Sequence, residues 1–120
     1  MSMRLDYNRI APAGSKALGG VYGYVLQSKL PSSLINLVYL RVSQINNCAY
    51  CLDMHTRELL KNGQKIEKLT LVQAWAEAGT LFDERELVDL TIAIGLMNAY
   101  NRMAISFRKT PQAVLQKAAA

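Results

Sequence analysis

SQINNCAYCLDMH, residues 43–55, contains both cysteines and the only histidine of this 120-residue chain. Cys48 and Cys51 are three residues apart and His55 follows four residues later, so a helix through them places all three on one face. Asn46-Asn47 precedes the pair, and asparagine tolerates the left-handed conformation with which helices often end. We therefore expect one helix to end here and another to begin at about Cys48.

The segments on either side of this stretch also have helical patterns. Pro31 suits a first helical turn, and apolar residues recur at helical spacing from there to Ile45. Asn62-Gly63 is typical of a helix end, and Asp83 followed by Glu86 is typical of a capped helix start. We predict one all-α domain over residues 1–120 with about five helices and no strands. The expected helices cover about 12–27, 31–45, 48–61, 66–78 and 84–108.

Two of these helices indicate packing against other parts of the protein. The helix over 12–27 contains four glycines, each costing about 1 kcal/mol relative to alanine, so we expect a late start or a close neighbour. The last helix is apolar on most sides, which in so small a domain indicates burial against a second subunit. We assign Trp75 and Phe82 to a core or interface. Tyr100, Asn101 and Arg102 could line a pocket, but we expect them at an interface.

Composition excludes several functional classes. The hydrophobic content of 51% is that of an ordinary globular domain. The net charge is +5, but the 14 lysines and arginines are scattered, so we expect a solvated basic surface and no nucleic-acid partner. We expect no membrane association, because no apolar stretch approaches the ~20 residues of a membrane span, and the N-terminus lacks the apolar core of a secretory signal. These features predict a cytoplasmic protein, and in that reducing compartment paired cysteines indicate redox or metal chemistry.

The position of the cysteines favours a reactive thiolate. Unpaired backbone N–H groups and the positive end of the helix dipole stabilise negative charge at a helix start. His55, one turn beyond Cys51, could stabilise a thiolate as imidazolium or move a proton. A low-pKa thiol beside a second thiol is the arrangement that reduces a peroxide, through a sulfenic acid and then a disulfide.

Three other interpretations of the cysteines have less support. The cysteines could serve packing alone, but a histidine one turn later at a helix start makes that less probable. A Cys₂His zinc site fits poorly, because three ligands on one helix rarely surround a tetrahedral metal and the chain has no further Cys or His. A thioredoxin-like site requires an α/β pattern, which is missing here. We therefore expect neither a metal nor a cofactor.

Together, residues 40–46 and 48–55 resemble the LRVSQINxCxYCxxxH pattern of the carboxymuconolactone decarboxylase superfamily, in its alkylhydroperoxidase D-like branch. Residues 98–108 resemble the closing helix of that family. The resemblance implies an all-α fold that assembles into homo-oligomers, as trimers or hexamers. It also implies thiol-dependent reduction of hydrogen or alkyl peroxides, with a dithiol or a disulfide reductase as electron donor. In this family the second cysteine attacks the peroxide, the first resolves, and the histidine relays protons, which carries over to Cys51, Cys48 and His55.

This chain departs from the family pattern at two relay positions and in length. The relay glutamate, twelve residues before the first cysteine, is here Asn36, and a relay histidine between the cysteines is here Tyr50. Glu58 or Asp53 could substitute, although Asp53 lies off the helical face of Cys51. We therefore expect weak activity, because general acid–base catalysis is typically worth about 10²–10⁴-fold. The chain also looks like a shortened member, with less helical sequence before the last helix.

Other functions on the same fold stay open. A redox sensor or interaction module with a reversible CxxC disulfide and little turnover would explain the altered relay positions. A lyase of the same fold is a further alternative. Decarboxylating relatives do not depend on a CxxC pair, so the presence of Cys48 and Cys51 argues against that alternative.

Overall fold

The computed structural model describes residues 3–65 and 83–119. All regular structure in these ranges is helical, as predicted. The helices are α1 (Tyr7–Ile10), α2 (Pro12–Leu26), α3 (Ser32–Ile45), α4 (Ala49–Lys61), α6 (Glu84–Ser106) and α7 (Gln112–Ala119). The helix expected over 66–78, with Trp75, and the neighbouring Phe82 lie outside the described residues. No described helix is both long and apolar enough to cross a membrane.

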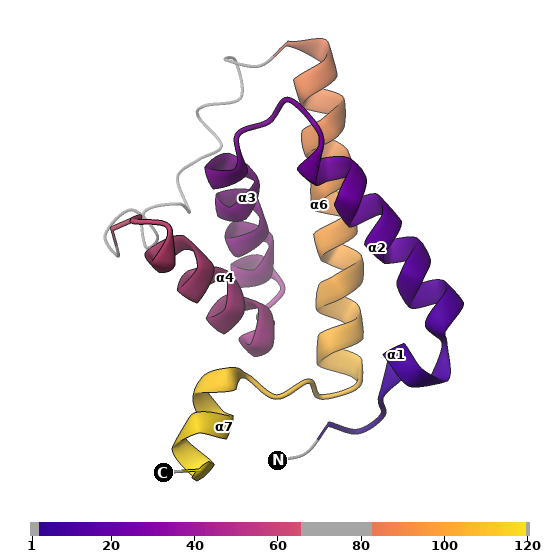
Figure 1. Cartoon of the computed structure of the whole chain (residues 1–120), viewed down its shortest axis with the longest axis vertical. Coiled ribbons are helices and arrows are strands. Elements are labelled where there is room, and N and C mark those ends of the chain that lie inside the picture. The colour runs from indigo at the N-terminus through magenta and orange to yellow at the C-terminus, as the bar shows by residue number, and fades with distance from the viewer. Residues whose placement is uncertain (1–2, 66–82, 120) are drawn as a thin grey trace.

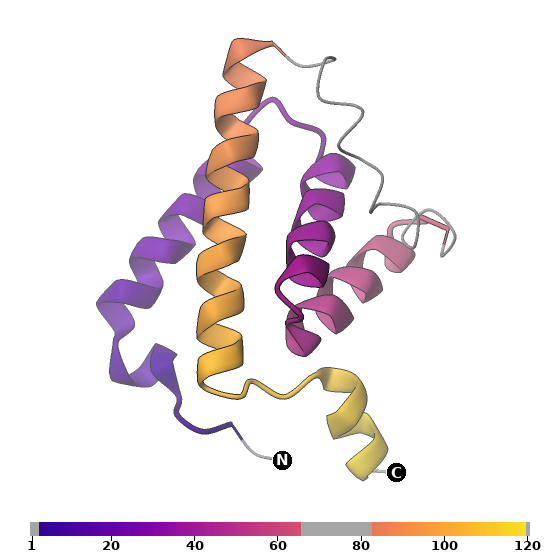
Figure 2. The ribbon, with the colours of Figure 1, turned by 180° about the vertical axis from the view of Figure 1, so that it is seen from behind.

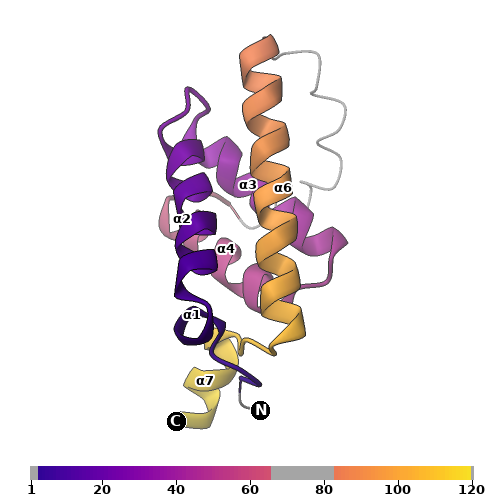
Figure 3. The same ribbon diagram turned by 90° about the vertical axis from the view of Figure 1, so that its right-hand side faces the viewer.

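The long helix α6 forms the centre of the fold, with α2 on one side and α3 on the other (Figure 1). The helices α3 and α6 run in the same direction, while α2 runs the opposite way. At the end of α3 the chain turns back into α4, which diverges from α3 toward its own far end (Figure 2). α7 lies across the end of the bundle where α4 begins and α6 ends, close to both chain termini (Figure 3).

Local sequence signals explain most helix boundaries. Pro12 is the first residue of α2, where its missing N–H costs no hydrogen bond. α3 ends before Asn47, which adopts φ 54°, and α4 ends before Gly63 at φ 85°. A capping box begins α6: Asp83 Oδ1 accepts from Glu86 N at 2.8 Å, and Asp83 N donates to Glu86 Oε2 at 3.0 Å.

The structure differs from the sequence prediction at four points. The short helices α1 and α7 were not predicted, and α6 ends at Ser106 rather than near Arg108. Neither form of the expectation about the glycines of α2 is met within a single chain. α2 starts at Pro12, and a Cβ atom placed at any of its four glycines meets no described heavy atom within 4 Å. Each of these glycine positions is therefore open within the described part of a single chain.

Three groups of buried side chains hold the helices together. The largest joins α2, α3 and α6 and consists of Val25, Leu30, Ile35, Val38, Tyr39, Val42, Leu90, Ala93, Leu96 and Met97. Leu40 and Leu59 join α3 to α4. The third group is small and joins Cys48 and Cys51 to Ala104 of α6. The two thiols thus lie where the start of α4 packs against the C-terminal part of α6.

Apolar side chains also remain on the surface of α6. Leu87, Val88 and Ile105 are 44%, 55% and 48% exposed in the single chain. A partner subunit that covered them would satisfy the expectation that this helix is buried on most sides. The predicted homo-oligomer stays a prediction.

Candidate functional site

Cys48 and Cys51 lie at the start of α4, immediately after the left-handed turn at Asn47. Cys48 is the N-cap residue, with an extended backbone at φ −86° and ψ 98°, and Cys51 lies in the first turn. This arrangement brings the two Sγ atoms to 2.7 Å, where they share a hydrogen bond. The two cysteines are not joined by a disulfide, and both are buried. Because a disulfide joins its sulfurs at about 2.05 Å, oxidation of this pair needs only a small movement.

The hydrogen bond between the sulfurs separates the acidities of the two thiols. It lowers the pKa of Cys48 to about 7, against the effect of burial, because the Cys51 thiol stabilises a Cys48 thiolate. Backbone N–H groups of Cys51 and Tyr50 act in the same direction, as expected at a helix start. The same hydrogen bond, together with burial, raises the pKa of Cys51. The pair therefore loses its first proton more readily than an ordinary thiol does, and that titration belongs to both sulfurs.

His55 lies one turn beyond Cys51 and is only 4% exposed. Its ring packs at a tilt against the ring of Tyr39, with centroids 5.4 Å apart. No described residue forms a hydrogen bond with Nε2. Burial lowers the pKa of His55 to about 4, so the imidazole is neutral at pH 7. Of the two roles considered from the sequence, this neutral ring is suited to moving a proton and not to acting as an imidazolium.

A buried polar network joins the end of α3 to α6. Asn46 Nδ2 donates to Oδ1 of Asn98 at 2.7 Å and to Oδ1 of Asn101 at 3.0 Å. Asn101 Nδ2 in turn donates to Ser43 Oγ at 3.1 Å. A hydrogen bond from the Asn101 side chain also favours the thiolate of Cys51. Asn101 was expected at an interface, but it is 1% exposed and contacts the redox pair within one chain.

Lys109 brings a positive charge to the same place. Its backbone follows Arg108, which adopts φ 53°, and its N–H donates to the carbonyl of Ala104 at 2.9 Å. The ammonium Nζ lies 4.3 Å from the ring centroid of Tyr50 and 5.7 Å from that of Tyr7. Its charge favours the thiolate form of both cysteines and so acts to lower the pKa of each.

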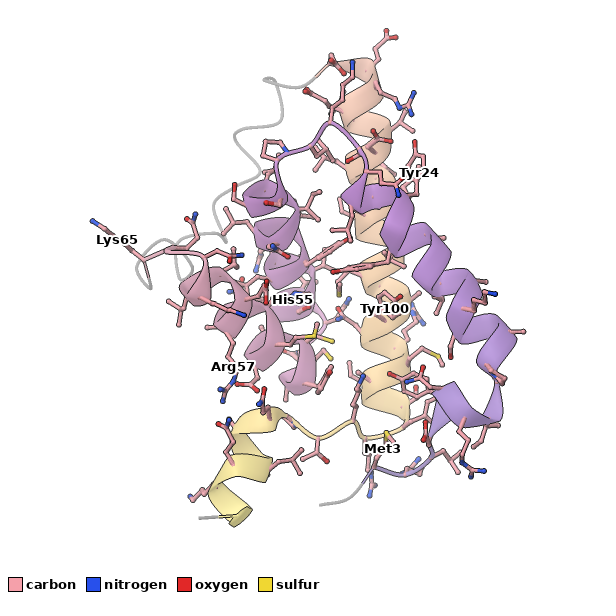
Figure 4. All side chains as sticks on the ribbon, viewed as in Figure 1. Met3, Tyr24, His55, Arg57, Lys65 and Tyr100 are labelled. Atoms are coloured by element: carbon pink, nitrogen blue, oxygen red, sulfur yellow. The ribbon has the colours of Figure 1, made fainter. Side chains whose placement is uncertain are left out.

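A pocket of about 540 Å³ opens onto Cys51 and His55. Asn36 and Tyr50, the two altered relay positions, also line it, and Glu58 is the only carboxylate among its described lining residues. Figure 4 shows His55 and Tyr100 at the same height of the bundle, on the α4 side and the α6 side. The other walls are largely aromatic or apolar and include Tyr7, Leu18, Tyr22, Leu26, Met97 and Tyr100.

A second, smaller cavity of about 310 Å³ lies on the other side of the pair. Cys48 lines this cavity and Cys51 does not, whereas the large pocket touches Cys51 and not Cys48. Tyr50, Ala104 and Lys109 line both spaces and so form the partition between them.

Asp53, named from the sequence as a possible relay carboxylate, has a different role. Its Oδ1 pairs with Arg57 Nε at 2.9 Å, and its Oδ2 accepts from the backbone N–H of Ala113 at 3.2 Å. Arg57 also donates to Gln116 Oε1 at 3.2 Å, and Figure 4 shows its side chain beside α7. These contacts fasten α7 to α4, away from the large pocket.

The predicted grouping of Cys48, Cys51 and His55 agrees with the structure. The contacts of Asn101 and Lys109 with the cysteine pair were not predicted. Asn101 is 50 residues from Cys51, and only the packing of α6 against α4 brings them together. The closing-helix resemblance over 98–108 was the one available signal for this region. Across residues 3–65 and 83–119, no group of three or more His, Cys, Asp or Glu side chains is placed to hold a metal ion.

Comparison with known proteins gives consistent results. The model of the carboxymuconolactone decarboxylase family matches residues 12–84. An uncharacterized protein of Bacillus subtilis (strain 168), YdfG, is 30% identical over 139 aligned positions, which cover 88% of this chain and 95% of that protein. Since the alignment is longer than the 120 residues of this chain, the relative carries residues that this chain lacks. This agrees with the prediction of a shortened member.

A solved structure is also similar over nearly its whole length. It is a protein of unknown function from Agrobacterium tumefaciens, described as a candidate antioxidant defence protein AhpD. The TM-score is 0.83 at 29% sequence identity, and the match covers 92% of this chain and 98% of that one.

The buried neutral His55 predicts a specific loss of stability in acid. The unfolded chain binds a proton at a pKa of about 6.5, whereas the folded chain binds it only near pH 4, so the unfolded state holds more protons between these values. The stabilisation is complete above pH 6.5 and is lost as the pH falls to 4, by roughly 3 kcal/mol. Denaturant titrations of wild type and His55→Gln at pH 7, 5.5 and 4 measure it. We expect the difference in unfolding free energy to shrink in acid, and a constant difference would contradict the assignment.

Proposed function

This chain belongs to the carboxymuconolactone decarboxylase family, in its alkylhydroperoxidase D-like branch, and from this premise we propose that it is a thiol-dependent peroxidase. One observation carries the proposal. Two buried cysteine sulfurs lie 2.7 Å apart, and one of the two residues, Cys51, lines a pocket that is also lined by a neutral histidine. This is the geometry needed to convert a peroxide into an alcohol and to store the oxidation as a disulfide. We further propose that it acts as a homo-oligomer in the cytoplasm.

The reaction has two steps at the pair. In the first, the Cys51 thiolate attacks one peroxide oxygen, an S–O bond forms, the O–O bond breaks, and the leaving alkoxide takes a proton to become an alcohol. In the second, the Cys48 thiolate attacks the Cys51 sulfenic acid, an S–S bond forms, and the hydroxyl leaves as water with one added proton. A dithiol donor then supplies two electrons and returns both cysteines to the thiol form.

The charge needed for the first step is available near neutral pH. The pKa of Cys48 is lowered to about 7, and the proton that remains on the pair lies between two sulfurs 2.7 Å apart. Its transfer to Cys48 leaves the negative charge on Cys51, where the hydrogen bond from Asn101 and the charge of Lys109 stabilise it. The neutral His55 lines the same pocket, where its ring can pass a proton to the leaving oxygen by accepting one at one ring nitrogen as it releases one from the other.

Proton relay beyond His55 is the weak part of the site. Asn36 occupies the position of the family glutamate and has no proton to exchange near neutral pH. Glu58 lines the same pocket one turn after His55, and we propose that it takes over the exchange with solvent. Because the Glu58 side chain is exposed to solvent, we expect it to replace the function of the family glutamate only in part.

The pocket favours an organic peroxide over hydrogen peroxide. Its volume of about 540 Å³ lies within the range of ligand pockets, about 300–1,000 Å³. Tyr22, Tyr100 and the apolar side chains of Leu18 and Met97 offer contacts to an alkyl or aryl group.

A second candidate function is a redox sensor with little turnover. The observation that favours it is the polar, proton-inert Asn36 in the wall of the pocket. The cysteine pair would then be oxidised slowly and would signal through the disulfide itself.

Single cysteine variants test the roles of the two thiols. With an organic hydroperoxide and a sulfenic-acid trap such as dimedone, we expect Cys48→Ser to accumulate a trapped adduct on Cys51, because no second thiol can condense with it. We expect Cys51→Ser to give no rapid adduct, and both variants to lose steady-state turnover. Peptide mass spectrometry locates the adduct. Unchanged turnover in Cys51→Ser would exclude the proposed function, and a rapid adduct on Cys48 would reverse the roles.

A variant that restores the relay carboxylate at position 36 distinguishes a weakened peroxidase from a redox sensor. We expect Asn36→Glu to raise peroxide turnover by about 10-fold or more, because general acid–base assistance is worth about 10²–10⁴-fold. Asn36→Gln is the control, since it has the same length without an ionisable group. A gain in the glutamate variant alone identifies the chain as a weakened peroxidase. Equal rates in all three proteins would favour the sensor.

A further inference from the structure

Cys51 lines the large pocket and Cys48 lines the second cavity, and we propose that these spaces are separate entrances for oxidant and reductant. Peroxide reaches Cys51 through the large pocket. An anionic small thiol or dithiol reaches Cys48 through the second cavity of about 310 Å³. This inference rests on the proposed function, because it assigns the reductant of the same disulfide.

The second cavity is formed by three elements around Cys48. The start of α4 contributes Cys48, the end of α6 contributes Ile105, and the segment leading into α7, with Val114 of α7 itself, closes the far side. The contacts of Asp53 and Arg57 with α7 hold this wall in place. The partition of Tyr50, Ala104 and Lys109 separates the cavity from the large pocket.

The positive charge that lines the second cavity favours an anionic reductant. Arg108 and Lys109 both line it, and no carboxylate is among its described lining residues. A thiolate is the nucleophile in disulfide exchange, so positive charge raises the local concentration of the reacting species. A carboxylate on the same small molecule would be attracted for the same reason. The remaining lining is apolar, with Ile105, Pro111 and Val114, and suits a short hydrocarbon chain.

The chemistry is balanced when the attack occurs at Cys48. The reductant thiolate forms an S–S bond with Cys48 Sγ, the Cys48–Cys51 bond breaks, and Cys51 leaves as a thiolate. A second thiol then attacks the reductant sulfur of the mixed disulfide, and Cys48 leaves as a thiolate. The reductant is oxidised to its disulfide, and two electrons have passed to the pair.

Cys51 is an adequate leaving group in this step despite its raised pKa in the reduced pair. The main cause of that rise in pKa is the hydrogen bond with Cys48, followed by burial and then by the negative charge of Cys48. The hydrogen bond and the charge are absent while Cys48 is bound in a mixed disulfide, and only the effect of burial persists. The contacts that favour the Cys51 thiolate, from Asn101 and Lys109, remain. Because the Cys51 thiolate is the first to leave, the group that attacks peroxide is regenerated in the wall of the large pocket.

Filling the second cavity tests the proposal. The disulfide is first formed with diamide, so that its reduction is measured whether or not the protein turns over peroxide. Val114→Trp places a large ring in the cavity wall, and Leu115→Trp is the matched control, an exposed neighbour on α7 that does not line the cavity. We expect reduction by mercaptoacetate to slow at least 10-fold in Val114→Trp and to stay near the wild-type rate in Leu115→Trp. A wild-type rate in Val114→Trp, or equal slowing in both variants, would overturn the proposal.

A charge variant provides an independent readout. Wild type should be reduced faster by anionic mercaptoacetate than by neutral 2-mercaptoethanol at equal thiolate concentration, and added salt should remove the difference. Arg108→Gln should lower this preference at least 3-fold, whereas Arg102→Gln, which removes an exposed arginine of α6 outside both cavities, should not. Equal preference in the two variants would overturn the role of the charge. Failure of peroxide turnover together with the expected reduction pattern would reject the proposed function alone.

Discussion

The site depends on one buried side chain, Asn101, which links three helices. It accepts a hydrogen bond from Asn46 and donates one to Ser43, both at the end of α3, and it contacts Cys51 in α4. A buried amide that lost these partners would cost about 1–3 kcal/mol for each group left unpaired. The network therefore fixes where α3 stops against α6, and with it the turn that presents the two cysteines.

From that constraint the properties of the thiols follow. The turn at Asn47 leaves Cys48 outside the helix, where it can approach Cys51 and also use the free N–H groups of the first turn. The same packing buries His55 and keeps it neutral. Each cysteine lines a different space, which allows one pair to bind oxidant and reductant at separate places.

Much of this arrangement was predictable from the sequence, because it depends on neighbours in the chain. Asn46-Asn47, Asn62-Gly63 and the box of Asp83 and Glu86 marked helix boundaries correctly, and the spacing of the cysteines and His55 placed them on one helix. The short helices α1 and α7 were missed, since helices of this length depend on tertiary contacts such as that of Asp53 with Ala113. The contacts of Asn101 and Lys109 join residues about 50 to 60 positions apart in the sequence, and no local pattern encodes such a distance.

The central claim is that Cys48 and Cys51 form one two-electron redox unit within a single chain. The most direct measurement is a count of free thiols and the intact mass after reaction of the reduced protein with one equivalent of an organic hydroperoxide. We predict the loss of two thiols per chain, a mass lower by the two thiol hydrogens, and one equivalent of the corresponding alcohol. Retention of both thiols, stable addition of oxygen, or a disulfide between chains would contradict the account.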